Sequence, residues 1–148
     1  MVQIPPRSVL VPTDFCEACD EALQVASKLV APGGQVHVAH VLEDLSGNEL
    51  GAFWGTIDDT RRVQLTTQAL KEYAARAGVP DVQIHVEITT GNPAHGIVDL
   101  AERLGVDLVV MPSHGRTGLA RLTLGSVAER VVRLASCPVL VLRGGADR

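Results

Sequence analysis

Short apolar runs rich in β-branched residues recur along the chain, and segments with helical periodicity separate them. The runs are SVLVP (8–12), QVHVAHV (35–41), VQIHVEI (82–88), DLVVM (107–111) and PVLVLR (138–143). Only 3% of the residues are aromatic, so Val, Leu, Ile and Ala must build the core, as they do in buried parallel sheets. Five strands alternating with four helices predict a doubly wound α/β fold with a parallel sheet.

The first two helices are predicted over residues 17–30 and 58–77, and residues 42–57 between them read as an irregular loop. In the first helix the residues at helical spacing are expected on one apolar face. These are Ala22, Ala26, Leu29 and Val30. Gly78 and Pro80 should end the second helix. The strand over residues 82–88 alternates strictly, which favours a half-exposed position near the sheet edge.

Local signals also define the two remaining helices. Asn92 is placed as an N-cap and Pro93 as the first helical residue, and Gly105 is expected to end that helix. Ser126 and Glu129 read as a capping box at the start of the last helix.

Length and charge narrow the class of protein. A chain of 148 residues predicts one domain, 1–148, with an N-terminal arm (1–7) and a C-terminal tail (144–148). The net charge of -4, with both signs interspersed, argues against a nucleic-acid partner. The amino terminus lacks the pattern of a secretory signal peptide, and no apolar run approaches about 18 residues. We therefore expect no membrane association and a cytoplasmic location.

Two loops that follow strands are rich in polar and glycine residues. They are VPTDFCEAC (11–19) and the segment from Met111 to Ser126. In open parallel sheets, ligands bind outside the carboxyl ends of the strands, where the strand order reverses. In a sheet of order 3-2-1-4-5 both loops would flank that crevice. Gly125 and Ser126 open a helix whose unpaired N–H groups attract anions, although a plain Gly-rich connection with a serine cap explains them as well.

The chain resembles the universal stress protein family over nearly its whole length. The resemblance rests on VLVPTDF, HVAHV, GNPAHGIVDLAERLGVDLVVM and SHGRTGLARLTLGSVAERVVRLASCPVLVLR. It implies a Rossmann-like adenine-nucleotide-binding fold and ATP binding through a Gly, two residues, Gly, nine residues, Gly-Ser/Thr pattern. Gly115, Gly125 and Ser126 match that pattern, but Pro112 stands where it has its first glycine. Because proline has no N–H to donate, the expected nucleotide site is weakened but not abolished.

The resemblance also assigns the remaining contacts of the expected site. It places Asp14 near the adenosine, Val41 where the adenine docks and Met111 at the base of the pocket. Pro12 and Thr13 flank Asp14, and the backbone of Val127 lies near the phosphates. From the residues alone, Asp14 reads equally well as a helix cap. The expected ligand is ATP, AMP or ADP, alone or with Mg²⁺.

The function that follows is a nucleotide-dependent regulatory or stress-response module with at most slow hydrolysis. No histidine is paired in sequence with a nucleophile or an orienting acid, so no catalytic residue is assigned. His40 is expected close to the adenine pocket and His114 in the glycine loop. Pro112 motivates an alternative, a family member that binds no nucleotide and acts through protein–protein interaction.

The C-x-x-C pair Cys16 and Cys19 suggests a third hypothesis, a dithiol oxidoreductase. Asp14, Glu17 and Asp20 surround the pair with negative charge, which opposes thiolate formation and disfavours that role. A zinc site would need two more ligands, and no second C-x-x-C or H-x-x-x-H motif exists, so no metal site is expected. Cys137, just before the last strand, reads as a small buried hydrophobe.

The last apolar run, from Pro138 to Arg143, falls at a sheet edge in the expected strand order. An exposed apolar edge invites pairing with another chain, and two copies related by a two-fold axis would satisfy it. The resemblance implies the same arrangement, so we expect a homodimer through this strand.

Overall fold

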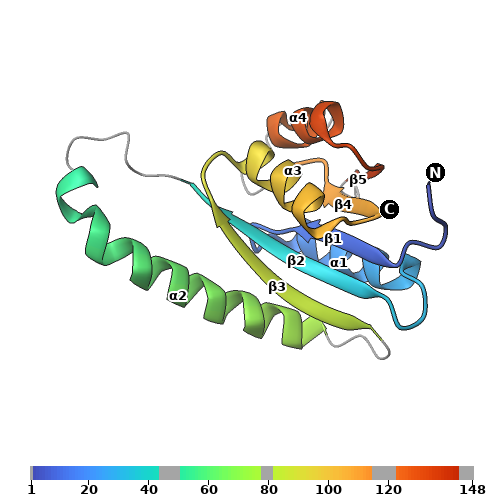
Figure 1. Ribbon diagram of the computed structural model, residues 1–148, viewed down its shortest axis with the longest axis horizontal. Helices are drawn as coiled ribbons and strands as arrows, with labels where there is room; N and C mark the ends of the chain where they lie inside the picture. The colour runs from blue at the N-terminus through green and yellow to red at the C-terminus, as the bar shows by residue number, and fades with distance from the viewer. Residues whose placement is uncertain (1, 44–50, 78–81, 115–122, 144–148) are drawn as a thin grey trace.

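The computed structural model describes residues 2–43, 51–77, 82–114 and 123–143, with backbone only over 51–58 (Figure 1). Within these residues, strands and helices alternate along the chain. The strands are β1 (Ser8–Pro12), β2 (Gln35–Leu42), β3 (Gln83–Thr90), β4 (Leu108–Pro112) and β5 (Val139–Leu142). The helices are α1 (Glu17–Leu29), α2 (Gly51–Ala77), α3 (Pro93–Leu104) and α4 (Ser126–Leu134).

The five strands form one parallel sheet in the order β3-β2-β1-β4-β5, which confirms the predicted fold. The chain winds outward from β1 through β2 to β3, then crosses back to place β4 on the other side of β1. The strand order therefore reverses between β1 and β4. As predicted, β3 and β5 are the edge strands.

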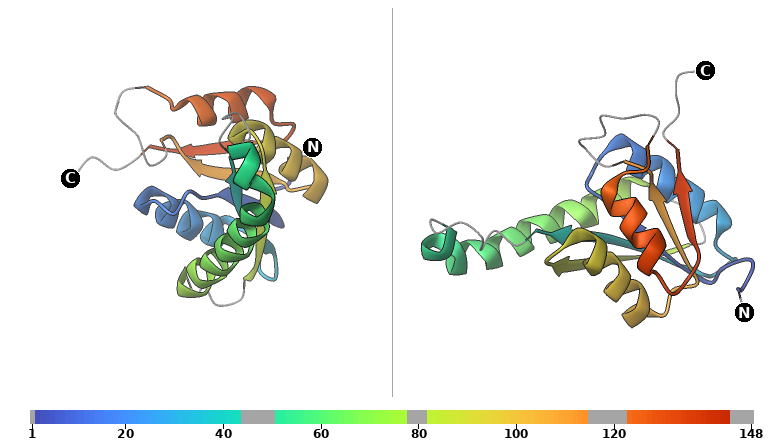
Figure 2. Two further views of the ribbon diagram at one scale, coloured as in Figure 1. Left: turned by 90° about the vertical axis from the view of Figure 1, so that its left-hand side faces the viewer. Right: turned by 90° about the horizontal axis from the view of Figure 1, so that it is seen from above.

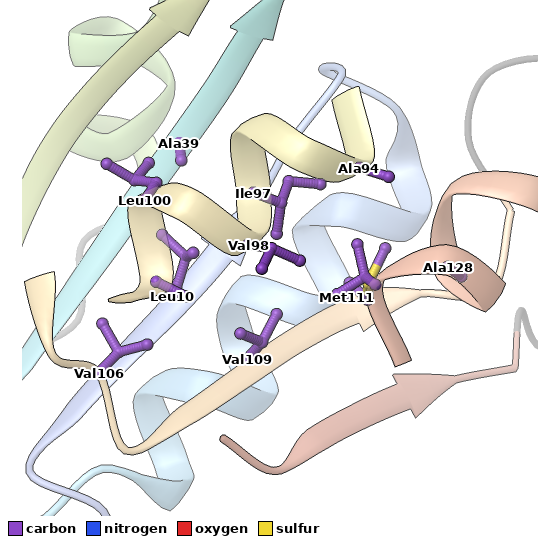
Figure 3. Packing of buried hydrophobic residues seen from close by; sticks show 12 residues of the cluster. Leu10, Ala39, Ala94, Ile97, Val98, Leu100, Val106, Val109, Met111 and Ala128 are labelled. Carbon is purple, nitrogen blue, oxygen red and sulfur yellow. The ribbon is translucent and has the colours of Figure 1, made fainter. Parts of the chain in front are cut away.

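Helices cover both faces of the sheet. Figure 2 shows α4 over β4 and β5 on one side, with α1 on the opposite side. One core cluster joins α3 and α4 to the sheet, and in Figure 3 Ile97 and Val98 of α3 lie over Val109 of β4. The second cluster joins α1 and α2 to the other face and includes Leu23 and Leu70, each 1% exposed or less. Within the described ranges, no helix is both long and apolar enough to cross a lipid bilayer.

Helix α3 begins and ends where its sequence predicts. The Asn92 side chain accepts a 3.2 Å hydrogen bond from the His95 backbone N–H, as an N-cap does. Pro93 is the first helical residue. An N–H at that position has no partner within the helix, so proline costs no hydrogen bond there. Gly105 ends the helix in the left-handed region, at φ 61°, which glycine adopts without steric strain.

The predicted loop over residues 42–57 is wrong at both ends. Strand β2 continues through Leu42, which pairs with Thr90 on β3. Helix α2 begins at Gly51, so the glycines at 51 and 55, read as loop residues, lie within a helix. Glycine lowers helix propensity by only about 1 kcal/mol, which the rest of a long helix offsets. Strand β3 likewise runs two residues beyond the predicted Ile88, and the predicted stop signals Gly78 and Pro80 lie outside the described residues.

Two side-chain predictions at helix ends are also wrong. The N-cap of α4 is Gly125, and no side chain caps the helix, so Ser126 and Glu129 form no capping box. Ser126 is instead the first helical residue. In α1, Ala22 and Ala26 are buried as predicted, but Leu29 is 39% exposed because it is the last helical residue, at the rim of the core.

The segment before β1 is attached to the residue that precedes β4, the strand beside β1. The Asp107 carboxylate accepts hydrogen bonds from the backbone N–H groups of Arg7 and Ser8, at 2.7 and 3.0 Å. The sequence predicts Asp107 as the first residue of the fourth strand, but β4 begins at Leu108. The carboxylate therefore fixes the entry of β1 beside β4, at the amino end of the sheet.

Candidate functional site

A cavity of about 850 Å³ lies at the carboxyl ends of β1, β2 and β4, against the start of α4. Its position is where the strand order reverses, as is usual for ligand sites in open parallel sheets. Its volume falls within the range of small-molecule pockets, about 300–1,000 Å³. Its walls include Pro12 and Pro112 at the ends of β1 and β4, and Gly125 at the start of α4.

Backbone hydrogen bonds fix the loop between β1 and α1. The Thr13 N–H donates to the Ala39 carbonyl oxygen at 2.7 Å, and the His40 ring donates through Nδ1 to the Thr13 carbonyl oxygen, also at 2.7 Å. The Thr13 hydroxyl in turn accepts from the Phe15 N–H at 3.0 Å. This loop is therefore held against the end of β2, which brings Asp14 and His40 to the same cavity.

Phe15 occupies an unusual position in the same loop. Its φ of 66° lies in the left-handed region, which a residue with a bulky side chain rarely adopts. Its ring packs between His40 and Tyr73, with centroid distances of 5.2 and 5.9 Å. These two aromatic contacts offset the backbone strain and attach the loop to α2.

The start of α4 is joined to the end of β4 by one short contact. The Gly125 N–H donates to the Ser113 carbonyl oxygen at 2.8 Å. A Cβ at position 125 would lie 2.6 Å from that oxygen, closer than real Cβ atoms approach. Glycine is required here for close approach, since its φ of -62° is open to any residue. The contact directs the first turn of α4 toward the cavity.

Pro112 lies at the end of β4, where no hydrogen bond to a neighbouring strand needs its N–H. The next residue, Ser113, donates its N–H to Leu142 on β5, so the nitrogen of Pro112 faces the opposite side, toward β1. The pairing of β1 with β4 ends before that point, at Leu10 and Val109. Pro112 therefore leaves the crevice without the backbone N–H that any other residue would present there.

The thiols of Cys16 and Cys19 are held in their neutral forms. Burial and hydrogen bonds with Asp14 and Cys19 raise the pKa of the Cys16 thiol well above its ordinary value, and burial raises the pKa of Cys19. Thiolate formation is thus opposed, as predicted, but the main cause is burial, and of the three predicted acidic residues Asp14 contributes, through hydrogen bonds. Cys137, predicted buried, is only half-buried beside β5, and burial raises its pKa too.

All but one of the predicted site residues line the cavity. They are Pro12, Thr13, Asp14, Val41, Met111, Pro112, Gly125, Ser126 and Val127. The remaining one, Gly115, lies outside the described residues. The loop after β1 and the two described ends of the segment from Met111 to Ser126 thus converge on one cavity.

Other lining residues escape prediction from the sequence. Arg62 comes from α2, where its guanidinium lies 3.6 Å from Asp59 and 3.5 Å from the Glu43 carbonyl oxygen. Ile97 comes from α3. No sequence pattern indicates either contribution, because each depends on how a distant helix crosses the end of β2. His114, which the sequence places in the glycine loop, lines the cavity as well, and its buried Nε2 has no hydrogen-bond partner among the described residues.

Comparison with known proteins identifies the family. A model of the universal stress protein family matches residues 6–143, which is nearly all of the chain. The chain belongs to the universal stress protein family. A curated relative, universal stress protein MJ0531 of Methanocaldococcus jannaschii, is 36% identical over 141 residues, which cover 93% of this chain and 82% of the relative.

Solved structures of universal stress proteins share the fold. That of MJ0577 superimposes with a TM-score of 0.77 at 28% identity, covering 95% of this chain and 98% of that one. A family protein from Arabidopsis thaliana with AMP bound has a TM-score of 0.63 at 21% identity, covering 96% and 94% of the two chains. A universal stress protein in complex with cAMP has the same TM-score at 22% identity, covering 93% and 97%. At these lower identities the likeness concerns the fold alone.

Proposed function

We propose that this universal stress protein binds an adenine nucleotide, ATP above all, in the cavity at the carboxyl end of its sheet. It would act as a nucleotide-dependent regulatory or stress-response module with at most slow hydrolysis. The observation that carries the proposal is the convergence of the β1–α1 loop and the start of α4 on one cavity at the point of strand reversal. Fold relatives with AMP or cAMP bound make adenine nucleotides the first ligands to test.

The half of the cavity at the end of β2 suits an adenosine group. Val41, Ile97 and Met111 give it apolar walls, which favour a planar base. Asp14 also lines the cavity, and its carboxylate can accept hydrogen bonds from ribose hydroxyl groups. The proposed adenosine position therefore combines an apolar slot with one strong acceptor.

The half at α4 suits a chain of phosphates. The first backbone hydrogen bond within α4 runs from Glu129 N–H to the Gly125 carbonyl oxygen. The N–H groups of Ser126, Val127 and Ala128 precede it and have no partner within the helix, as at every helix start. They add to the positive end of the helix dipole, which attracts anions. Because the Ser126 hydroxyl is not a helix cap, it too is available to a phosphate oxygen.

Isothermal titration calorimetry with ATP, ADP and AMP, each with and without Mg²⁺, tests the proposal. Saturable heats with one site per chain are expected for at least one of the nucleotides. Ser126→Ala should weaken binding of ATP more than that of AMP if α4 holds the outer phosphates. Heats equal to those of dilution at millimolar nucleotide would contradict the proposal, and would favour a family member that acts through protein–protein interaction instead.

A further inference from the structure

A carboxylate and two thiols meet at the start of α1, at one edge of the large cavity. Cys16 is the N-cap of the helix and Cys19 is its third residue, two positions whose side chains lie on the same side of a helix end. The Sγ atoms are 2.8 Å apart, and the Cys19 Sγ lies 3.2 Å from Oδ1 of Asp14. One donor atom from each of the three residues lies within 4.8 Å of the others.

We propose that Asp14, Cys16 and Cys19 bind a thiophilic divalent metal ion of the zinc class. Two thiolates with one carboxylate form a donor set that favours zinc over Mg²⁺ or Ca²⁺, which prefer oxygen ligands alone. The spacing C-x-x-C supplies only two of these ligands. The third becomes visible only in the structure, where the turn after β1 returns Asp14 to the two sulfurs.

The geometry requires only a small adjustment. Zinc–sulfur bonds of about 2.3 Å at a tetrahedral angle separate two sulfurs by ~3.8 Å, so the thiols must move apart by about 1 Å. Rotation of the half-buried Cys16 side chain can supply this movement. A zinc ion with three protein ligands keeps a fourth position, as in catalytic zinc sites. Asp14 and Cys19 both line the large cavity, so that position is open to water or to a ligand within it.

The surrounding charge favours a cation at this point. Glu17 and Asp20 lie in the first turn of α1, and this turn holds no basic residue. Their negative charge would stabilise a bound divalent ion. A helix cap would need only Asp14, whose carboxylate accepts from the Cys16 N–H at 3.2 Å. The cap therefore leaves the convergence of two thiols on that carboxylate unexplained.

Metal titration of the full-length chain tests this site. The protein is purified metal-free, kept reduced with a phosphine, and titrated with Zn²⁺ against a chromophoric chelator in the absence of nucleotide. One zinc ion per chain is expected. Co²⁺ in its place should give the charge-transfer absorption of thiolate ligands and the intense visible bands of tetrahedral cobalt.

Three variants separate the proposed ligands from the rest of the chain. Removal of an outer-shell partner of a metal site typically weakens binding ~10–100-fold, so loss of both thiols in a Cys16→Ser/Cys19→Ser variant should weaken zinc at least ~100-fold. Asp14→Asn, which keeps a cap acceptor, should weaken it at least ~10-fold. Cys137→Ser, the matched control, should bind zinc as the unaltered chain does. Far-UV circular dichroism checks that each variant is folded.

Several results would overturn the proposal. These are absence of zinc binding by the reduced chain, unchanged affinity in the double serine variant, unchanged affinity in Asp14→Asn, or weak octahedral cobalt bands. Since no nucleotide is present, failure here leaves the proposed nucleotide site untouched.

Discussion

The Gly125 backbone N–H donates a 2.8 Å hydrogen bond to the carbonyl oxygen of Ser113. This bond joins the start of α4 to the residue that follows β4, across residues 115–122, which the structure does not describe. It determines where the unpaired N–H groups of α4 lie relative to the ends of the strands. The proposed phosphate site therefore depends on a position where no side chain fits.

Substitution of Gly125 by alanine should weaken nucleotide binding and destabilise the fold. The new Cβ would lie 2.6 Å from the Ser113 oxygen, so the first turn of α4 must move away. Overpacking of this kind typically costs about 1–3 kcal/mol of unfolding free energy. Urea unfolding and calorimetry with ATP or AMP measure the two effects.

Gly91→Ala is the matched control for that variant. Gly91 has a φ of 120° and does not line the cavity, and a Cβ there would meet nothing within 4 Å. This variant should lose stability through backbone strain and retain its nucleotide affinity. Equal loss of affinity in both variants would mean that nucleotide binding weakens only because the fold is destabilised. The contact between Gly125 and Ser113 would then not be needed to position the phosphate site.

Replacement of Pro112 by glycine or alanine should strengthen nucleotide binding. Either residue restores an N–H that points into the crevice, and a hydrogen bond to a charged phosphate is worth roughly 1.5–3 kcal/mol, or about 10- to 100-fold in affinity. The unfolding free energy should fall by about 0.4–1 kcal/mol, because proline restricts the unfolded chain. If neither variant binds more tightly than the unaltered chain, the interpretation of Pro112 as a weakening residue is wrong.

Stability should fall at alkaline pH because of the thiols at the start of α1. Their pKa values are raised in the folded chain, so unfolding releases protons once the pH passes the ordinary thiol value of 9.0. The free energy of unfolding should thus be unaffected by these groups below pH 8 and decline above pH 9. The Cys16→Ser/Cys19→Ser variant should show a smaller decline between pH 8 and 10.5 in urea unfolding. Identical pH profiles for the two proteins would contradict the raised thiol pKa values.

The edge strand β5 should mediate a homodimer. The carbonyl groups of Pro138 and Leu142 accept hydrogen bonds from β4, so the N–H and C=O groups of Val139 and Val141 point away from it, toward the open edge. Light scattering after gel filtration should give twice the chain mass of 15.7 kDa. Val141→Pro removes an outward donor without breaking the pairing to β4, and should give a folded monomer. A monomeric unaltered chain, or a dimeric Val141→Pro, would rule out this interface.

The sequence predicts those parts of the fold that depend on local chemistry. Asn92 and Gly105 mark the ends of α3 because a cap and a left-handed turn need particular residues. The strand order also follows, since right-handed crossovers leave few topologies for alternating strands and helices. The position of the candidate cavity follows from that strand order, because it makes β1 and β4 neighbours whose carboxyl ends border one crevice.

Features set by tertiary contacts could not be predicted in this way. At the start of α4 the predicted cap is wrong: Gly125 is the N-cap, its N–H bonded to the Ser113 oxygen, and a capping-box pattern cannot reveal such a contact. Similarly, Arg62 reaches the cavity only because α2 crosses the end of β2. The ligand set at the start of α1 also depends on the turn that brings Asp14 to Cys19.

Amide chemical-shift mapping with ¹⁵N-labelled protein and ATP or AMP asks whether a nucleotide occupies this cavity. We predict that saturable shifts concentrate at Thr13, Asp14 and Val41 and at the N–H groups of Ser126 and Val127, which border one cavity. The amide chemical shifts of β3 and of the carboxyl end of α2 should not change. Shifts confined to other surfaces, or none at millimolar nucleotide, would contradict nucleotide binding at the carboxyl end of the sheet.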